Sequence, residues 1–172
     1  MSLLNPFSRL PDLNTATILL VEREEEFQER LAEILVEEKA FTLKVRLAKS
    51  LPLPAANDGS RPRIDLVVFI INLTSDLSLQ SAEASVKYLD PDYFLGKVCF
   101  MATNARNAAV PQERLDALRK VAASLSCPLL FAEHQTADGA SGAAERLGTI
   151  LKVAAGLVPM TTALSLSNAA MM

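Results

Sequence analysis

The densest group of chemically capable side chains in this chain is a run of carboxylates near its start. Within residues 22–29, a single arginine stands among five acids: Glu22, Glu24, Glu25, Glu26 and Glu29. Two like charges about 4 Å apart repel each other by roughly 4 kcal/mol at a surface-like dielectric. Carboxylates at this spacing therefore repel a polyanion such as the phosphates of a nucleotide.

These carboxylates lie between a predicted strand and a predicted helix. Residues 18–21 are apolar without interruption, which is typical of a parallel strand covered on both faces. A helix is expected over about 24–39, with one apolar face made of Phe27, Leu31, Ile34 and Leu35. Ligands of open α/β sheets bind at the carboxyl ends of the strands, and a phosphate-binding loop there needs glycines and a lysine. This turn has no glycine, so the sequence predicts the architecture of a nucleotide-binding domain without its phosphate site.

Strands and helices are predicted to alternate along the rest of the chain. After a first strand at 17–21, further strands are expected at about 43–48, 64–73, 97–103 and 128–132. Helices are expected after a cap at Asp76 or Ser78, after Pro111, and over 143–155. This order predicts the α/β class: a three-layer α/β/α fold with a mostly parallel sheet of five to six strands. The span between the first helix and the central strand is too short for both switch regions of a small GTPase, so reduced switch regions are expected.

The domain is expected to span 17–158, with an N-terminal lead-in (1–16) packed on it and a C-terminal tail (159–172). Residues 43–48 alternate apolar and basic side chains, which indicates a half-exposed edge strand. Residues 64–73 are apolar almost throughout and are expected to form a central strand. A connection rich in helix- and strand-breaking residues separates the two, at 49–63.

Other residues capable of chemistry lack the neighbours that chemistry requires. Asp65 is at the start of the central strand, the wrong end for a magnesium-holding carboxylate, and His134 is the only histidine. Cys99 and Cys127 are interpreted as core residues in a reducing compartment, and the glycine-containing segment 138–142 as a flexible cap. No spacing typical of a catalytic triad, a cysteine–histidine pair or a metal site is present, so we expect no enzyme, no cofactor and no metal.

Two families share this order of elements, and both keep their chemistry at the strand ends. A small GTPase needs D-x-x-G and N-K-x-D, but the segment at the base-reading position is Asn104-Ala105-Arg106-Asn107. The acidic turn and Thr103 resemble parts of a phospho-receiver. Such a domain needs an aspartate at the position near Ile70 or Ile71 and a lysine near Ala132 or Glu133, and this chain has neither. A degenerate receiver-like domain or a weak nucleotide-binding switch remains the alternative to a non-catalytic domain.

Several apolar residues fall outside the expected core pattern. Tyr93, Phe94 and Leu95 occupy a short connection before a strand, where they either close the end of the core or form a patch for a partner. The tail also stays apolar, with Leu164 among its residues. We take Leu95, Leu164, Tyr93 and Phe94 as candidate partner-binding residues.

Charge and hydropathy disfavour two other kinds of partner. The formal net charge of −3 and a pI near 5.2 give no basic surface for direct nucleic-acid binding. No signal peptide or membrane-spanning segment is predicted.

Longer motifs resemble the centromere protein M family. They are LNTATILLV (13–21), LAKSLPLP (47–54), RPRIDLVVF (61–69) and FLGKVCF (94–100), with PLL (128–130) and A-G-x-V-P (155–159) further along. The resemblance covers nearly the whole chain in order. The chain departs from the family pattern after Val21, near 104–112, and at a tail that looks shorter.

The resemblance implies a small-GTPase-like domain that neither binds nor hydrolyses nucleotide. It implies a nuclear protein of the inner kinetochore, within the constitutive centromere-associated network at the centromere of the chromosome. There it would act in mitosis as a monomeric subunit, contacting the helical-repeat protein centromere protein I and, through it, centromere proteins H and K. It also implies that Leu95 and Leu164 contribute to the contact with centromere protein I.

Overall fold

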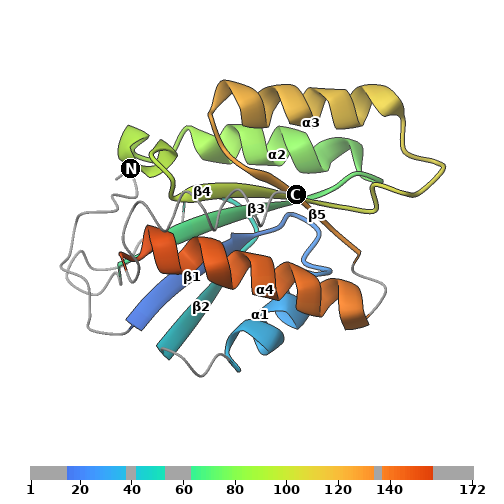
Figure 1. Cartoon of the computed structure of the whole chain (residues 1–172). Helices are drawn as coiled ribbons and strands as arrows, with labels where there is room; N and C mark the ends of the chain where they lie inside the picture. The colour runs from blue at the N-terminus through green and yellow to red at the C-terminus, as the bar shows by residue number, and fades with distance from the viewer. Residues whose placement is uncertain (1–14, 38–41, 53–62, 134–136, 157–172) are drawn as a thin grey trace.

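A single parallel sheet of five strands lies at the centre of the computed structural model, which describes residues 15–37, 42–52, 63–133 and 137–156 (Figure 1). The strand order is β2-β1-β3-β4-β5. The strands are β1 Thr15–Val21, β2 Thr42–Ala48, β3 Leu66–Asn72, β4 Val98–Thr103 and β5 Leu129–Ala132. The helices are α1 Gln28–Leu35, α2 Asp76–Val86, α3 Gln112–Ser124 and α4 Ala137–Ala154, with a 3₁₀ helix, η1, at Pro91–Phe94.

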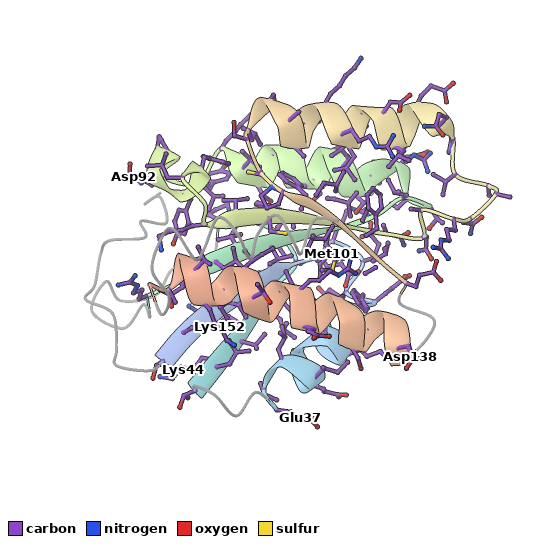
Figure 2. All side chains as sticks on the ribbon, viewed as in Figure 1. Glu37, Lys44, Asp92, Met101, Asp138 and Lys152 are labelled. Atoms are coloured by element: carbon purple, nitrogen blue, oxygen red, sulfur yellow. The ribbon has the colours of Figure 1, made fainter. Side chains whose placement is uncertain are left out.

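Helices cover both faces of this sheet. Successive strand residues point to opposite sides, so strands that are apolar at every position present an apolar surface on both faces. Ile18 and Leu20 of β1 pack toward α1 and α4, whereas Leu19 and Val21 pack toward α2 and α3. Met101 of β4, labelled in Figure 2, is fully buried on the side of α4. The three-layer α/β/α fold predicted from the sequence is therefore confirmed, with five strands and no sixth among the described residues.

The predicted positions of individual strands are also confirmed. β3 is buried along its whole length and lies between β1 and β4, as its apolar sequence indicates. β2 is the outermost strand on one side, with Leu43 and Val45 in the core beside α1. β1 begins at Thr15, within the predicted lead-in. The rest of that lead-in, most of the 49–63 connection, and the 159–172 tail lie outside the described residues.

Two helices start at places other than those predicted. α1 was expected from about residue 24 but starts at Gln28, because Glu25 has a left-handed backbone (φ 56°) that a helix cannot continue through. α4 starts at Ala137, so the glycine-containing segment 138–142 lies inside the helix and the prediction of a flexible cap is wrong. The N-cap of α2 is Ser75, whose side chain accepts a hydrogen bond from the Leu77 N–H, rather than Asp76 or Ser78.

Polar groups at the amino ends of the strands tie β3 to β1. Asp65 accepts hydrogen bonds from the Thr17 N–H (2.8 Å) and from Arg63 Nε (2.6 Å). The carboxylate is buried, so these partners compensate for its loss of water. Its position at the amino edge is the one inferred from the sequence, and its role there is structural.

The two cysteines pack as apolar side chains. Cys99 is fully buried in β4, Cys127 is half-buried, and both are free thiols. Burial raises the pKa of both thiols, that of Cys127 to about 12, so both stay protonated near neutral pH. The prediction of core packing is confirmed.

None of the helices in the described ranges combines the length and the apolar composition needed to cross a bilayer.

Candidate functional site

The turn between β1 and α1 is where related folds would bind a phosphate, and here the chain's own carboxylate fills it. Glu22, 1% exposed, directly follows β1. Its Oε1 accepts hydrogen bonds from the backbone N–H groups of Phe27 (2.8 Å) and Gln28 (2.9 Å). The N–H groups at the start of a helix are those that bind an external anion in nucleotide-binding folds. Two of the N–H groups that would bind a phosphate at the start of α1 are thus already used within the molecule.

The environment of Glu22 is costly for a charge. Burial raises the pKa of its carboxyl group, the two backbone hydrogen bonds oppose that rise, and the nearby carboxylates of Glu24 and Glu26 add to it. A second anion brought to this turn would meet the same three carboxylates. The repulsion of polyanions inferred from the sequence therefore has a structural basis.

A polar network continues from this turn across the carboxyl ends of β3 and β4. Asn72, the last residue of β3, accepts hydrogen bonds through Oδ1 from the N–H and hydroxyl of Thr74 and from Asn104 Nδ2 (2.8 Å). Its own Nδ2 donates to Glu26 (3.4 Å). Ser78 of α2 accepts from the Asn72 N–H (3.0 Å) and donates to Glu24 (3.2 Å). The network joins the acidic turn, the end of β3, α2 and the loop after β4.

Composition and strand assignment alone did not single out Asn72 or Asn104. The sequence signal for Asn72 was a polar residue at the end of the apolar run of β3. The signal for Asn104 was its residue type, because asparagine tolerates the left-handed backbone that the structure shows there (φ 62°). Both amides bond to neighbours instead of pointing at a ligand site.

The positions that a phospho-receiver would use carry no phosphotransfer group. Ile70 and Ile71, where the acceptor was sought, are buried, and the polar side chain at the strand end is the amide of Asn72. Thr103 donates its hydroxyl to the Ile71 carbonyl (3.4 Å). After β5, Glu133 pairs with Arg106 (3.2 Å) in the place sought for a lysine.

A pocket of about 510 Å³ lies farther along the same edge, beside the start of α4. Its lining includes Arg106, Phe131, Glu133, Asp138, Gly142 and Arg146. Arg146 donates to the carbonyls of Phe131 (2.6 Å) and Gly142 (3.3 Å), and Arg106 is paired with Glu133. Its arginines are thus engaged with the chain itself. Among the described residues, no cluster of acidic, histidine or cysteine side chains is arranged to hold a metal ion.

The opposite, amino edge of the sheet carries three of the four candidate partner-binding residues. Figure 2 labels Asp92 of η1 at this edge and Asp138 of α4 at the other. Tyr93 is 1% exposed and donates its hydroxyl to the Ile64 carbonyl (3.3 Å), so it closes the end of the core. Phe94 packs against the same core and is half-buried. Leu95 follows η1 and is 78% exposed.

The three neighbours therefore differ in exposure, from the buried Tyr93 to the exposed Leu95. The side chain of Tyr93 has a structural role and does not form part of the surface. Leu95 is the most exposed large apolar residue among the described residues. Leu164 lies outside them.

The amino edge also contains the start of the segment that carries Leu164. Lys97, two residues after Leu95, donates its ammonium group to the Ala154 carbonyl at the end of α4. The backbone N–H of Lys97 also donates to the Tyr93 carbonyl (2.9 Å). α4 ends at this contact, and Leu164 follows eight residues after Gly156. The chain leading to Leu164 thus starts beside the base of the Leu95 segment.

Comparison with known proteins identifies the family. The family model for centromere protein M matches residues 1–172. The chain belongs to the centromere protein M family. It is 60% identical over 170 residues to centromere protein M of Danio rerio, covering 98% of this chain and 91% of that protein. It is 45% identical over 167 residues to centromere protein M of Homo sapiens (96% and 92% covered), and 43% identical over 169 residues to that of Xenopus laevis (98% and 94% covered).

Membership of this family identifies a centromere protein. The resemblance stated from the sequence motifs is confirmed over the full length of the chain. The names of these relatives refer to the centromere of the chromosome.

Proposed function

We propose that this protein is a non-catalytic pseudo-GTPase that acts as a scaffold subunit of the inner kinetochore. Its partner would be centromere protein I, a helical-repeat protein, and through it centromere proteins H and K. Its place would be the constitutive centromere-associated network in the nucleus. The family assignment supports the centromere role, and the two edges of the sheet support the rest.

The hydrogen bonds of Glu22 carry the non-catalytic part of this proposal. A phosphate approaching α1 would have to displace a carboxylate held at 2.8 and 2.9 Å by two N–H groups. It would do so among Glu24 and Glu26, without a glycine loop or a lysine to compensate for its charge. Nucleotide binding at this position is therefore opposed by both geometry and charge.

The exposure of Leu95 carries the partner-binding part. An apolar side chain that is 78% exposed next to a fully packed Tyr93 adds nothing to the core. Burying a leucine at an interface contributes about 1.5–3 kcal/mol. A groove between the helices of a repeat protein is a suitable site for such a side chain. Leu164 would reach the same partner from the segment that starts at the amino edge.

Nucleotide titration tests the first part. We expect the melting temperature of the full chain to stay constant when GTP, GDP or ATP is added with magnesium. A ligand at 100 times its dissociation constant would stabilise the protein by about 2.7 kcal/mol, an effect easily measured. A clear rise with any of these nucleotides would contradict the pseudo-GTPase assignment and favour a weak switch domain.

Substitution of Leu95 tests the second part. Leu95→Glu is expected to weaken binding to centromere protein I by at least about tenfold, because the lost burial is worth more than 1.4 kcal/mol. The matched control is Leu77→Glu, which changes another exposed leucine on α2 and should bind normally. Both variants should melt within a few degrees of the parent chain. Undiminished binding of a folded Leu95→Glu, Leu164→Glu double variant would overturn the assignment of this surface.

A further inference from the structure

The two outer strands of the sheet are protected to different degrees. β5 has four residues, and Arg146 donates a hydrogen bond to the outward carbonyl of Phe131 (2.6 Å). β2 has seven residues and pairs with β1 along its whole length. Short strands and capped carbonyls are common ways to block an outer strand from pairing with another chain. β5 has both protections, and the described residues supply neither to β2.

The backbone geometry shows which groups of β2 face away from β1. The Glu22 N–H donates to the Ala48 carbonyl (3.0 Å), so the backbone groups of Ala48, and by alternation those of Lys44 and Arg46, face β1. The N–H and C=O groups of Leu43, Val45 and Leu47 then point away from the sheet. No hydrogen bond from the described part of the chain reaches these outward groups. β2 lies at the rim of the sheet in Figure 1.

The side chains of β2 define what an added strand would contain. On the face toward α1, Leu43 is buried, Val45 is half-buried and Leu47 is 41% exposed. The other face carries Lys44, which is exposed at the rim (Figure 2), and Arg46. Side chains directly opposite each other on paired strands interact, and opposite charges stabilise the pair. A strand beside β2 would therefore alternate apolar residues on the first face with acidic residues on the second.

Charge argues against a second copy of the chain as the occupant. Two β2 strands paired edge to edge would bring Lys44 and Arg46 of one copy beside those of the other. Like charges opposite each other destabilise a strand pair. An acidic segment has no such penalty, and these two positive residues stand out on a chain of net charge −3.

We propose that β2 is a docking edge for an extended segment of a partner protein in which acidic and apolar residues alternate. Backbone hydrogen bonds to the outward groups of Leu43, Val45 and Leu47 would supply the affinity, and Lys44 and Arg46 the selectivity. This surface is separate from Leu95 at the amino edge. It does not depend on the proposed contact with centromere protein I.

Synthetic peptides test this edge on the full chain. The probe is a capped seven-residue peptide of alternating glutamate and valine, and the control has lysine in place of each glutamate. The glutamate peptide is expected to bind saturably and to shift the amide signals of Leu43, Val45 and Leu47 in NMR spectra. Added salt should weaken it, because the charges at the rim are screened. No binding, or equal binding of the lysine peptide, would overturn the proposal.

Two variants locate the binding site. Val45→Pro removes an N–H that points away from β1, so the inner hydrogen bonds of β2 remain while the edge is blocked. It should weaken the glutamate peptide at least tenfold, whereas Val45→Thr should bind as the parent does. Lys44→Glu alters only an exposed side chain and should weaken the same peptide several-fold, so it tests the edge even if the proline variant fails to fold. Unchanged binding in Lys44→Glu and in a folded Val45→Pro would place the peptide elsewhere and overturn the proposal.

Discussion

At the carboxyl edge of the sheet polar side chains bond to one another, whereas at the amino edge one apolar side chain stands in solvent. The carboxylate of Glu22 and the amide of Asn72 each satisfy several donors or acceptors of the chain itself. Leu95 is exposed, with Tyr93 buried two residues before it. Open α/β sheets bind ligands at the carboxyl ends of their strands, and here the polar side chains at that edge bond to the chain itself. The edge that is normally structural offers a surface.

The carboxyl edge shows how backbone groups at the start of a helix can be satisfied by the chain itself. A helix start leaves N–H groups that need an acceptor, whether or not a ligand is present. Glu22, directly after β1, supplies that acceptor to the N–H groups of Phe27 and Gln28. The cost is a carboxylate held in a buried, crowded position.

The sharpest test of the amino edge compares two residues of the same short segment. Tyr93→Ala should lower the free energy of unfolding by about 3–5 kcal/mol, because it removes a fully buried ring and its hydrogen bond to the Ile64 carbonyl. Leu95→Ala should change it by no more than about 0.5 kcal/mol. Urea unfolding of both variants measures the difference. Equal losses would show that Leu95 belongs to the core.

At the carboxyl edge, the corresponding test removes the internal acceptor. Glu22→Ala should cost about 1–3 kcal/mol of unfolding free energy, because the N–H groups of Phe27 and Gln28 lose their partner in a buried place. Glu29→Ala, an exposed acid on α1, is the control and should lie within about 0.5 kcal/mol of the parent. A stable Glu22→Ala variant would mean that this carboxylate does not hold the turn.

The backbone of the acidic turn predicts a gain in stability. Glu25 has φ of 56°, a conformation that costs a non-glycine residue about 1–2 kcal/mol. Glycine avoids this cost, but it loses more conformational entropy on folding, which offsets part of the gain. Glu25→Gly should therefore raise the unfolding free energy by about 0.5–1 kcal/mol. Glu29→Gly, inside α1, should lower it by about 1 kcal/mol. A loss in the first variant would indicate that the Glu25 side chain stabilises the turn.

The smallest expected effect separates the charge of Glu22 from its role as an acceptor. Burial raises the pKa of this carboxyl group, so ionisation costs the folded state more than the unfolded one. Its contribution to stability is therefore complete below the unfolded pKa and is lost as pH rises through the higher folded value. Glu22→Gln keeps an acceptor oxygen without the charge.

This variant should be slightly more stable than the parent at pH 7, and the difference should disappear near pH 4. Thermal melts of both proteins across this range measure the difference in stability. The other carboxyl groups are the same in both proteins, so their effects on stability cancel in the difference. A difference that grows toward low pH would reverse the sign expected from a raised pKa.

Most of the layered fold follows from patterns that are local in the sequence. Uninterrupted apolar runs such as 66–71 can only be covered on both faces, which predicts a central parallel strand. The alternation in 43–48 predicts an outer strand, because only one face of such a strand is apolar enough to be buried. The start of α1 was missed, because it depends on the left-handed backbone of Glu25 and on the hydrogen bonds that the Glu22 carboxylate accepts from Phe27 and Gln28.

The candidate sites were only partly readable. Carboxylate density predicted the exclusion of polyanions, but the contact between Asn72 and Asn104 joins residues 32 positions apart, and only the fold brings them together. Tyr93, Phe94 and Leu95 look alike in sequence. A 3₁₀ helix has about three residues per turn, so neighbours point in different directions, and which of them faces the core depends on the docking of η1.

The contact between Lys97 and the end of α4 has a mechanical consequence. Leu95 and the end of α4 occupy neighbouring positions, joined through Lys97, which donates a hydrogen bond to the Ala154 carbonyl. If a partner binds both Leu95 and the end of α4, a pulling force acts on the domain at one end of the strands only. Tension would then be borne locally between β4 and α4, and the remaining layers would not be stretched.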